Sequence, residues 1–148
     1  MDTAAPAQLT GTKIPPRKWL KPKSLTVLFH GYDSNGGVIS DMRVAFEKHL
    51  PGNYIFAPDA PRPVSESEFR WFDVVDATVD EIYNAVQSAA ELVNDTVDKY
   101  LDALGLDEAH TAFIGYSQGA CVALHAALTR SRRIAGVLTY SGQIAGPS

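Results

Sequence analysis

The pentapeptide Gly115-Tyr116-Ser117-Gln118-Gly119 constrains the fold of this chain more than any other stretch. An apolar run with strand character, residues 111–114, precedes it, and an alanine-rich helical run, residues 120–128, follows it. A G-x-S-x-G sequence between a strand and a helix is typical of a nucleophile elbow, a sharp turn that lifts the serine hydroxyl out of the sheet. The pattern predicts Ser117 as a nucleophile at a helix N-terminus, where the dipole favours a developing oxyanion.

Strand-like and helix-like stretches alternate along the chain. Apolar runs of strand length lie at residues 25–30, 54–57, 111–114 and 134–140, and helical patterns at 38–50 and 78–104. The second helix is predicted to begin at a capping box, Thr78 to Glu81, and to end at Gly105. Strands that alternate with helices imply right-handed crossovers, and therefore a parallel sheet with helices on both faces.

Composition narrows the class of protein. The 148 residues predict one domain, residues 24–148, preceded by an extended proline-rich arm over residues 1–23. A net charge of −4 argues against nucleic-acid binding, and no apolar stretch is long enough for stable membrane insertion. The single cysteine, Cys121, excludes an internal disulfide. Because no signal-like segment is visible either, a cytoplasmic location is expected. No cofactor is expected, and no histidine–carboxylate spacing suggests a metal site.

Three segments are expected to meet at the carboxyl edge of the sheet, namely residues 30–32, 117–118 and 140–142. Acyl transfer needs a nucleophile and two amides that face the tetrahedral oxyanion. The backbone N–H groups of Gln118 and of a residue just after His30 are placed to supply them.

Five short motifs, taken together, resemble the phospholipase/carboxylesterase family of α/β-hydrolases, which includes the acyl-protein thioesterases. They are Leu28–Tyr32 with Asn35-Gly36, Ala57–Pro61, Trp71–Asp73, Gly115–Gly119 and Tyr140–Gly142. The resemblance covers the family's N-terminal two-thirds, over about residues 9 to 148. It implies an incomplete α/β-hydrolase fold with about four parallel strands, in the spatial order 54–57, 25–30, 111–115, 135–140. It also implies a serine hydrolase that acts on small-molecule carboxylic esters or thioesters.

The resemblance assigns roles to individual residues. The oxyanion amides fall on Tyr32 and Gln118, and the substrate groove would involve Asp33, Trp71 and Phe72. Where this chain has Asp33, the family usually has glycine, so a side chain and a negative charge are added beside the oxyanion loop.

A second departure concerns the catalytic base. The family carries its triad Asp and His on later strands, whereas seven residues follow Ser141 here and none is Asp, Glu or His. By strand rise and helical rise, His110 lies about 20 Å and His125 about 12 Å from Ser117. Only His30 lies at the reactive edge, where the resemblance implies a structural role, although a role as base stays open.

Two hypotheses follow. In the first, the chain is part of a serine esterase whose remaining strands are absent from this sequence. In the second, it is a short non-hydrolytic protein that uses the same groove for binding. A third reading, a hydrolase related to dienelactone hydrolases, is disfavoured because that family generally uses a cysteine nucleophile where this chain has Ser117.

The strand predicted at residues 134–140 is apolar on both faces, which suits an interior strand. It carries no lysine, proline or other device that protects an edge. If it lies at an edge, we expect self-association through Ile134–Tyr140. The alternative is that the tail, residues 143–148, folds back over it.

Overall fold

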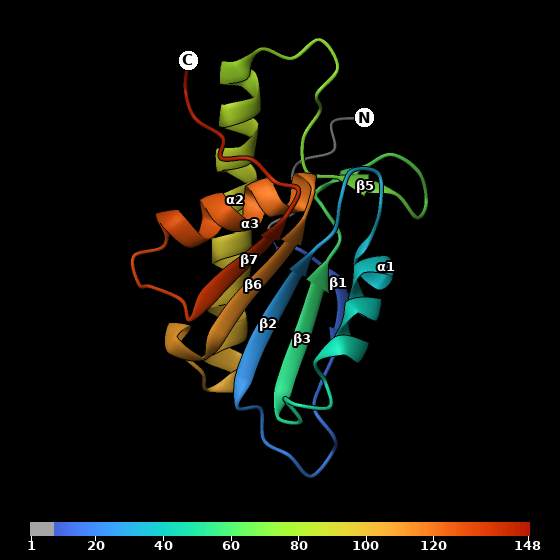
Figure 1. The fold of residues 1–148 in the computed structure, drawn as a ribbon, viewed down its shortest axis with the longest axis vertical. Helices are drawn as coiled ribbons and strands as arrows, with labels where there is room; N and C mark the ends of the chain where they lie inside the picture. The colour runs from blue at the N-terminus through green and yellow to red at the C-terminus, as the bar shows by residue number, and fades with distance from the viewer. Residues whose placement is uncertain (1–7) are drawn as a thin grey trace.

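The computed structural model describes residues 8–148, and its centre is a five-stranded sheet in the order β1-β3-β2-β6-β7 (Figure 1). The strands are β1 (Gly11–Ile14), β2 (Ser24–Phe29), β3 (Asn53–Pro58), β6 (Thr111–Tyr116) and β7 (Gly136–Tyr140). All pairings among β3, β2, β6 and β7 are parallel. The predicted four-stranded parallel sheet and its order are therefore confirmed.

Strand β1 is an addition to the predicted sheet. It lies within the segment expected as an extended arm, of which residues 1–7 are outside the described part of the chain, and it pairs antiparallel with β3. The two backbones approach so closely at Gly11 that a Cβ there would lie 2.3 Å from the Ala57 carbonyl oxygen. Just before β1, the Leu9 N–H donates to Thr96 Oγ1 at 3.1 Å, which ties the segment to helix α2 (Val79–Leu104).

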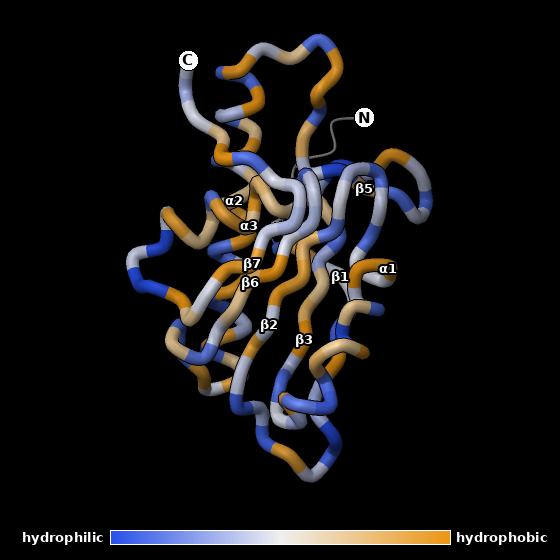
Figure 2. The backbone as a smooth tube through the Cα atoms, viewed as in Figure 1, coloured by the Kyte–Doolittle hydropathy of each residue, from blue (hydrophilic) through white to orange (hydrophobic). Residues whose placement is uncertain are grey.

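Helices cover both faces of the sheet (Figure 1). Leu25, Val27 and Phe29 of β2 belong to the larger core, which is completed by α2 and by α3 (Gln118–Thr129). Leu28 faces the opposite way and packs in a smaller core under α1 (Gly36–Ser40). A strand that is buried on both faces consists mostly of apolar residues. In Figure 2 most of β2 has the apolar colours.

Helix α2 agrees with its prediction at both ends. The Thr78 hydroxyl accepts from the Glu81 N–H and the Glu81 carboxylate accepts from the Thr78 N–H, so the capping box is complete. Gly105 closes the helix at φ 66°, in the left-handed region that glycine adopts without strain. Within residues 8–148, no helix combines the length and apolar character required to span a membrane.

The helix predicted over residues 38–50 is wrong in extent. The structure has the single short helix α1 followed by a 3₁₀ helix, η1 (Asp41–Ala45). Ile39 and Phe46 pack on the smaller core, but residues 47–50 are exposed. Since a protein helix is stabilised mainly by packing, a segment without a further buried face gains little from continuing as an α-helix.

The long connection after β3 contains a hairpin of two short antiparallel strands, β4 (Arg62–Pro63) and β5 (Phe69–Arg70). Ser34 bridges to Phe69 through two backbone hydrogen bonds of 3.1 and 2.8 Å. A short 3₁₀ helix, η2 (Glu108–His110), leads into β6. The loop after β2 and the loop after β3 are thus joined beside the carboxyl end of the sheet.

Candidate active site

Ser117 lies at the turn between β6 and α3, with φ 53° and ψ −118°. A positive φ is rare for a residue with a side chain and costs on the order of 1–3 kcal/mol, so surrounding contacts must hold it. One such contact is the hydrogen bond from the Ser117 N–H to the Tyr140 carbonyl oxygen, at 2.7 Å. The strained turn leaves Ser117 half-buried at the carboxyl edge, as the elbow motif predicts.

Glycine is required at both elbow positions, because backbone atoms of other residues lie very close to them. A Cβ on Gly115 would lie 2.6 Å from the Ala120 Cα, and a Cβ on Gly119 would lie 2.2 Å from the His30 carbonyl oxygen. The neighbouring atoms belong to the backbone, so a larger residue could not be accommodated by a rotamer change. The two positions fix how closely α3 approaches β6 and the end of β2.

A cavity of about 350 Å³ lies beside the nucleophile. It is lined by His30, Gly31, Tyr32, Ser34, Val38, Ile39, Tyr116 and Ser117. Gln118 is the first residue of α3, and Tyr32 lies two residues after His30 on the facing loop. Within residues 8–148, neither the Tyr32 N–H nor the Gln118 N–H has a hydrogen-bond acceptor. Two donors without acceptors beside a strained serine are what an oxyanion hole requires.

The Gln118 side chain fastens the aromatic loop to the elbow. Its Oε1 accepts from the Trp71 N–H at 2.7 Å, and its Nε2 donates to the Phe72 carbonyl oxygen at 2.7 Å. The Trp71 indole N–H donates to the His30 carbonyl oxygen at 2.9 Å. Trp71 and Phe72, which were expected to contact substrate, are 1% and 5% exposed. Their backbone and the Trp71 ring also hold the elbow in place.

Both ring nitrogens of His30 form hydrogen bonds to backbone groups. Its Nε2 accepts from the Ala60 N–H at 2.9 Å, which places the ring proton on Nδ1, where it is donated to the Gly31 carbonyl oxygen at 2.7 Å. Complete burial lowers the pKa of the imidazole below its ordinary value and favours the neutral form. Because both ring nitrogens are occupied, His30 has no free lone pair with which to deprotonate Ser117.

The other histidines are engaged elsewhere. The His110 ring bonds to Asp107 at the amino end of β6, and the His125 ring packs edge-on against Tyr83, two turns along α3. His49 lies in the turn after η1. Within the described residues, the structure therefore brings no histidine into position as a general base. The same residues contain no cluster of three or more metal-ligating side chains.

Asp33 adopts φ 49°, in the left-handed region, so this is a position where glycine would be unstrained. Its carboxylate is bound by Arg70 through two parallel bonds, Nε to Oδ1 at 2.8 Å and Nη2 to Oδ2 at 2.9 Å. The Arg70 guanidinium also bonds to Asp73 and lies over the Tyr32 ring, 4.5 Å from its centroid. Hydrogen bonds to the Asp33 and Asp73 carboxylates raise the pKa of Arg70 and, reciprocally, Arg70 lowers the pKa of Asp73.

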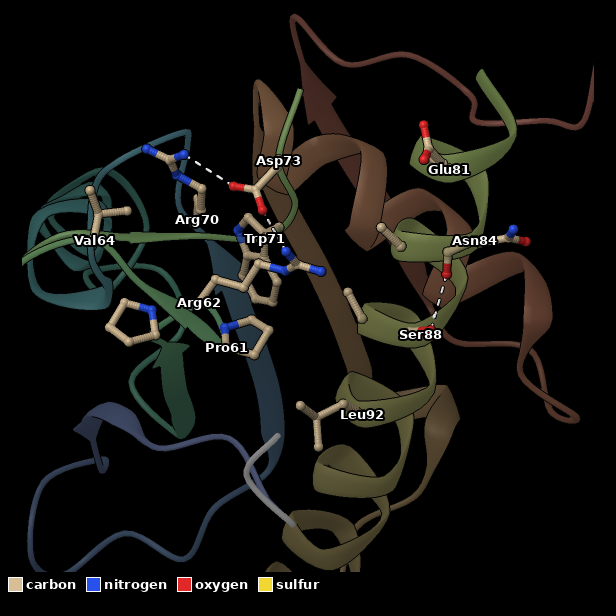
Figure 3. A pocket seen from close by; sticks show the side chains of 13 residues that line it. Pro61, Arg62, Val64, Arg70, Trp71, Asp73, Glu81, Asn84, Ser88 and Leu92 are labelled. Atoms are coloured by element: carbon tan, nitrogen blue, oxygen red, sulfur yellow. Dashed lines mark hydrogen bonds and ion pairs between the residues drawn. The ribbon is translucent and has the colours of Figure 1, made fainter. Parts of the chain in front are cut away.

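Arg70 was not singled out from the sequence, although it directly precedes the aromatic pair Trp71-Phe72. Figure 3 shows it with Asp73 and Arg62 at the rim of a second, larger depression of about 850 Å³. That depression lies between the hairpin loop and α2, and Ser117 is not among its lining residues. Of these two cavities, the smaller one is lined by Ser117.

Comparison with known proteins agrees with this geometry. The sequence model of the phospholipase/carboxylesterase family matches residues 16–148. Acyl-protein thioesterase 1 of Schizosaccharomyces pombe is 31% identical over 125 residues, which cover 79% of this chain and 55% of that protein. The chain thus spans about half the length of this curated relative.

Solved structures give the same result for the fold. The crystal structure of esterase PE8 superposes with a TM-score of 0.84 at 26% identity, covering 93% of this chain and 66% of that one. A phospholipase/carboxylesterase from Dyadobacter fermentans superposes with a TM-score of 0.70 at 23% identity, over 97% of this chain and 65% of the other. The elbow, the sheet order and the family match lead to one conclusion: this chain belongs to the phospholipase/carboxylesterase family of α/β-hydrolases.

Proposed function

We propose that this chain carries the nucleophile and the oxyanion hole of a serine hydrolase that cleaves carboxylic esters or thioesters. The observation that carries the proposal is Ser117 itself, held at a strained φ of 53° beside a cavity that Tyr32 also lines. Within residues 8–148, the N–H groups of Tyr32 and of the adjacent Gln118 have no hydrogen-bond acceptor. Such strain is retained where the surrounding structure imposes it, and it clusters at active sites. The similar proteins include an acyl-protein thioesterase and an esterase, which supports the same substrate class.

In the proposed reaction, Ser117 Oγ forms a bond to the acyl carbon as its proton passes to a general base. The carbonyl oxygen becomes an oxyanion and accepts hydrogen bonds from the amides of Tyr32 and Gln118. The bond to the alcohol or thiol then breaks and the leaving group departs with a proton. Water attacks the acyl-serine and releases the carboxylic acid. We assign the general base to residues outside 8–148, in the third or more of the relatives' length that this chain does not span.

The test is Ser117→Ala in the full-length protein, including any residues encoded after Ser148, with a short-chain p-nitrophenyl ester. Loss of the nucleophile is expected to reduce kcat by at least about 10³-fold, because the remaining groups give only residual catalysis. Ser131→Ala, at an exposed serine just beyond α3, is the matched control and should leave kcat unchanged. Activity of the Ser117 variant within tenfold of wild type would contradict the assignment.

The second candidate is a non-hydrolytic protein that binds a ligand in the same cavity. The observation that favours it is the engagement of both His30 ring nitrogens, which leaves Ser117 without a base among the described residues. Turnover by the purified 148-residue chain should then be close to background. Robust turnover that His30→Ala abolishes would contradict this and make His30 the base.

A further inference from the structure

Asp33 presents an electrostatic difficulty for the proposed reaction. It directly follows Tyr32, whose amide is one of the two proposed oxyanion donors, and its carboxylate is only 30% exposed. A carboxylate next to the place where negative charge develops would destabilise the transition state, more so in a partly desolvated site. The chain therefore needs a compensating positive charge at this position.

Arg70 supplies this positive charge, and its side chain is close enough to bond to the Asp33 carboxylate. Its side chain is 21% exposed and forms a fork-to-fork pair with both Asp33 oxygens, the strongest common arrangement for such ions. The same guanidinium lies over the Tyr32 ring, where a cation is attracted to the aromatic face. A single side chain thus contacts both residues of the turn that carries the amide.

The backbone fixes this contact. The two hydrogen bonds between Ser34 and Phe69 set the register of the two loops and place Arg70 opposite Asp33. On its outer side Arg70 bonds to Asp73, which in turn is bound by Arg62 (Figure 3). Two arginines and two aspartates alternate, so the network carries no net charge while Arg70 is present.

We propose that Arg70 is a positioning residue of the oxyanion hole, which neutralises Asp33 and holds the Tyr32–Asp33 turn so that the Tyr32 amide faces the cavity. The inference rests on the proposed hydrolase function. Arg70 acts through Asp33 and Tyr32 and needs no contact with substrate. Its contribution is therefore expected in kcat, where oxyanion stabilisation acts, rather than in KM.

The test compares variants of the full-length protein with a p-nitrophenyl ester. Arg70→Met should lower kcat about tenfold with KM within threefold, because it leaves the Asp33 charge uncompensated. The double variant Arg70→Met/Asp33→Asn removes both charges and should recover part of the lost kcat, while the loss of the fork that holds the turn remains. Arg70→Lys keeps the charge without the fork, so its kcat should lie between those of Arg70→Met and wild type. Arg62→Met, in the same network but without a contact to Asp33, is the matched control and should have little effect.

The dependence of kcat on salt concentration distinguishes an electrostatic role of Arg70 from a purely structural one. Raising the salt concentration from about 0.05 to about 0.5 M shortens the screening length, so it should partly restore kcat of Arg70→Met and barely change wild type. Ser117-dependent turnover that Arg70→Met leaves within threefold, or a double variant as slow as the single one, would overturn this inference alone. Turnover that does not depend on Ser117 would overturn the proposed function and this inference with it.

Discussion

The side chain of Gln118 offers the sharpest test of how the elbow is held. Gln118→Met keeps the length of the side chain but removes both of its hydrogen bonds, to the Trp71 N–H and to the Phe72 carbonyl oxygen. Both partners lie in a buried segment, so water cannot readily replace the lost contacts. The expected result is a less stable protein whose aromatic loop is no longer fixed to α3.

The size of the expected loss of stability follows from the two backbone groups, the Trp71 N–H and the Phe72 carbonyl oxygen, that the variant leaves without a partner. A buried backbone donor or acceptor left without a partner costs about 1–3 kcal/mol, so two cost about 2–6 kcal/mol. The added apolar surface of methionine offsets about 1 kcal/mol of this loss. We therefore expect the free energy of unfolding to fall by about 1–5 kcal/mol, a large share of the roughly 5–15 kcal/mol typical of a domain.

Equilibrium urea unfolding of the full-length protein measures this change. The matched control is Gln87→Met, the same substitution at an exposed position of α2, which should change the unfolding free energy by less than about 0.5 kcal/mol. Hydrogen exchange at the Trp71 amide should also accelerate in Gln118→Met, because that N–H loses its acceptor. If the variant loses less than about 1 kcal/mol, the clamp does not contribute to stability as argued.

Two other features give predictions. Burial lowers the pKa of the His30 imidazole, so below about pH 6.5 the unfolded chain binds this proton more readily than the folded protein does. The unfolding free energy should therefore fall below that pH by up to about 1.4 kcal/mol per pH unit. His30→Gln should flatten this dependence in urea titrations between pH 6.5 and 5.5, and an unchanged slope would refute the cause. The purified 148-residue chain should self-associate through β7, which lies at the sheet edge within the described residues. A stable monomer at micromolar concentration in size-exclusion chromatography with light scattering would contradict this.

The elbow and the four parallel strands could be predicted from sequence because each depends on a local pattern. Glycine spacing around Ser117 reflects close backbone contacts, and the apolar runs of β2 and β3 reflect burial on both faces. The capping box at Thr78 is equally local. Features of this kind are encoded within a few residues, which makes them visible without a structure.

The remaining features depend on contacts that are distant in sequence. Strand β1 is short, is followed by two prolines and is defined by its pairing with β3, so no periodicity marks it. The Arg70–Asp33 pair joins positions 37 residues apart, and the sequence shows only two charged residues in two loops. The prediction of a helix over residues 38–50 was wrong for a related reason. The length of a helix depends on a packing partner, which the exposed residues 47–50 lack.

The two edges of the sheet are chemically unlike, and this limits how copies of the chain can assemble. At one side, β1 has only four residues, carries Lys13 and runs into Pro15-Pro16, which are features that resist a further strand. At the other side, β7 has neither lysine nor proline, and Leu138 and Tyr140 are half-exposed. Within residues 8–148 β7 is the receptive edge, so strand addition between two such copies would use the same surface on both and would close as a two-fold symmetric pair. Growth into an open-ended fibre would require the β1 side to accept a strand as well.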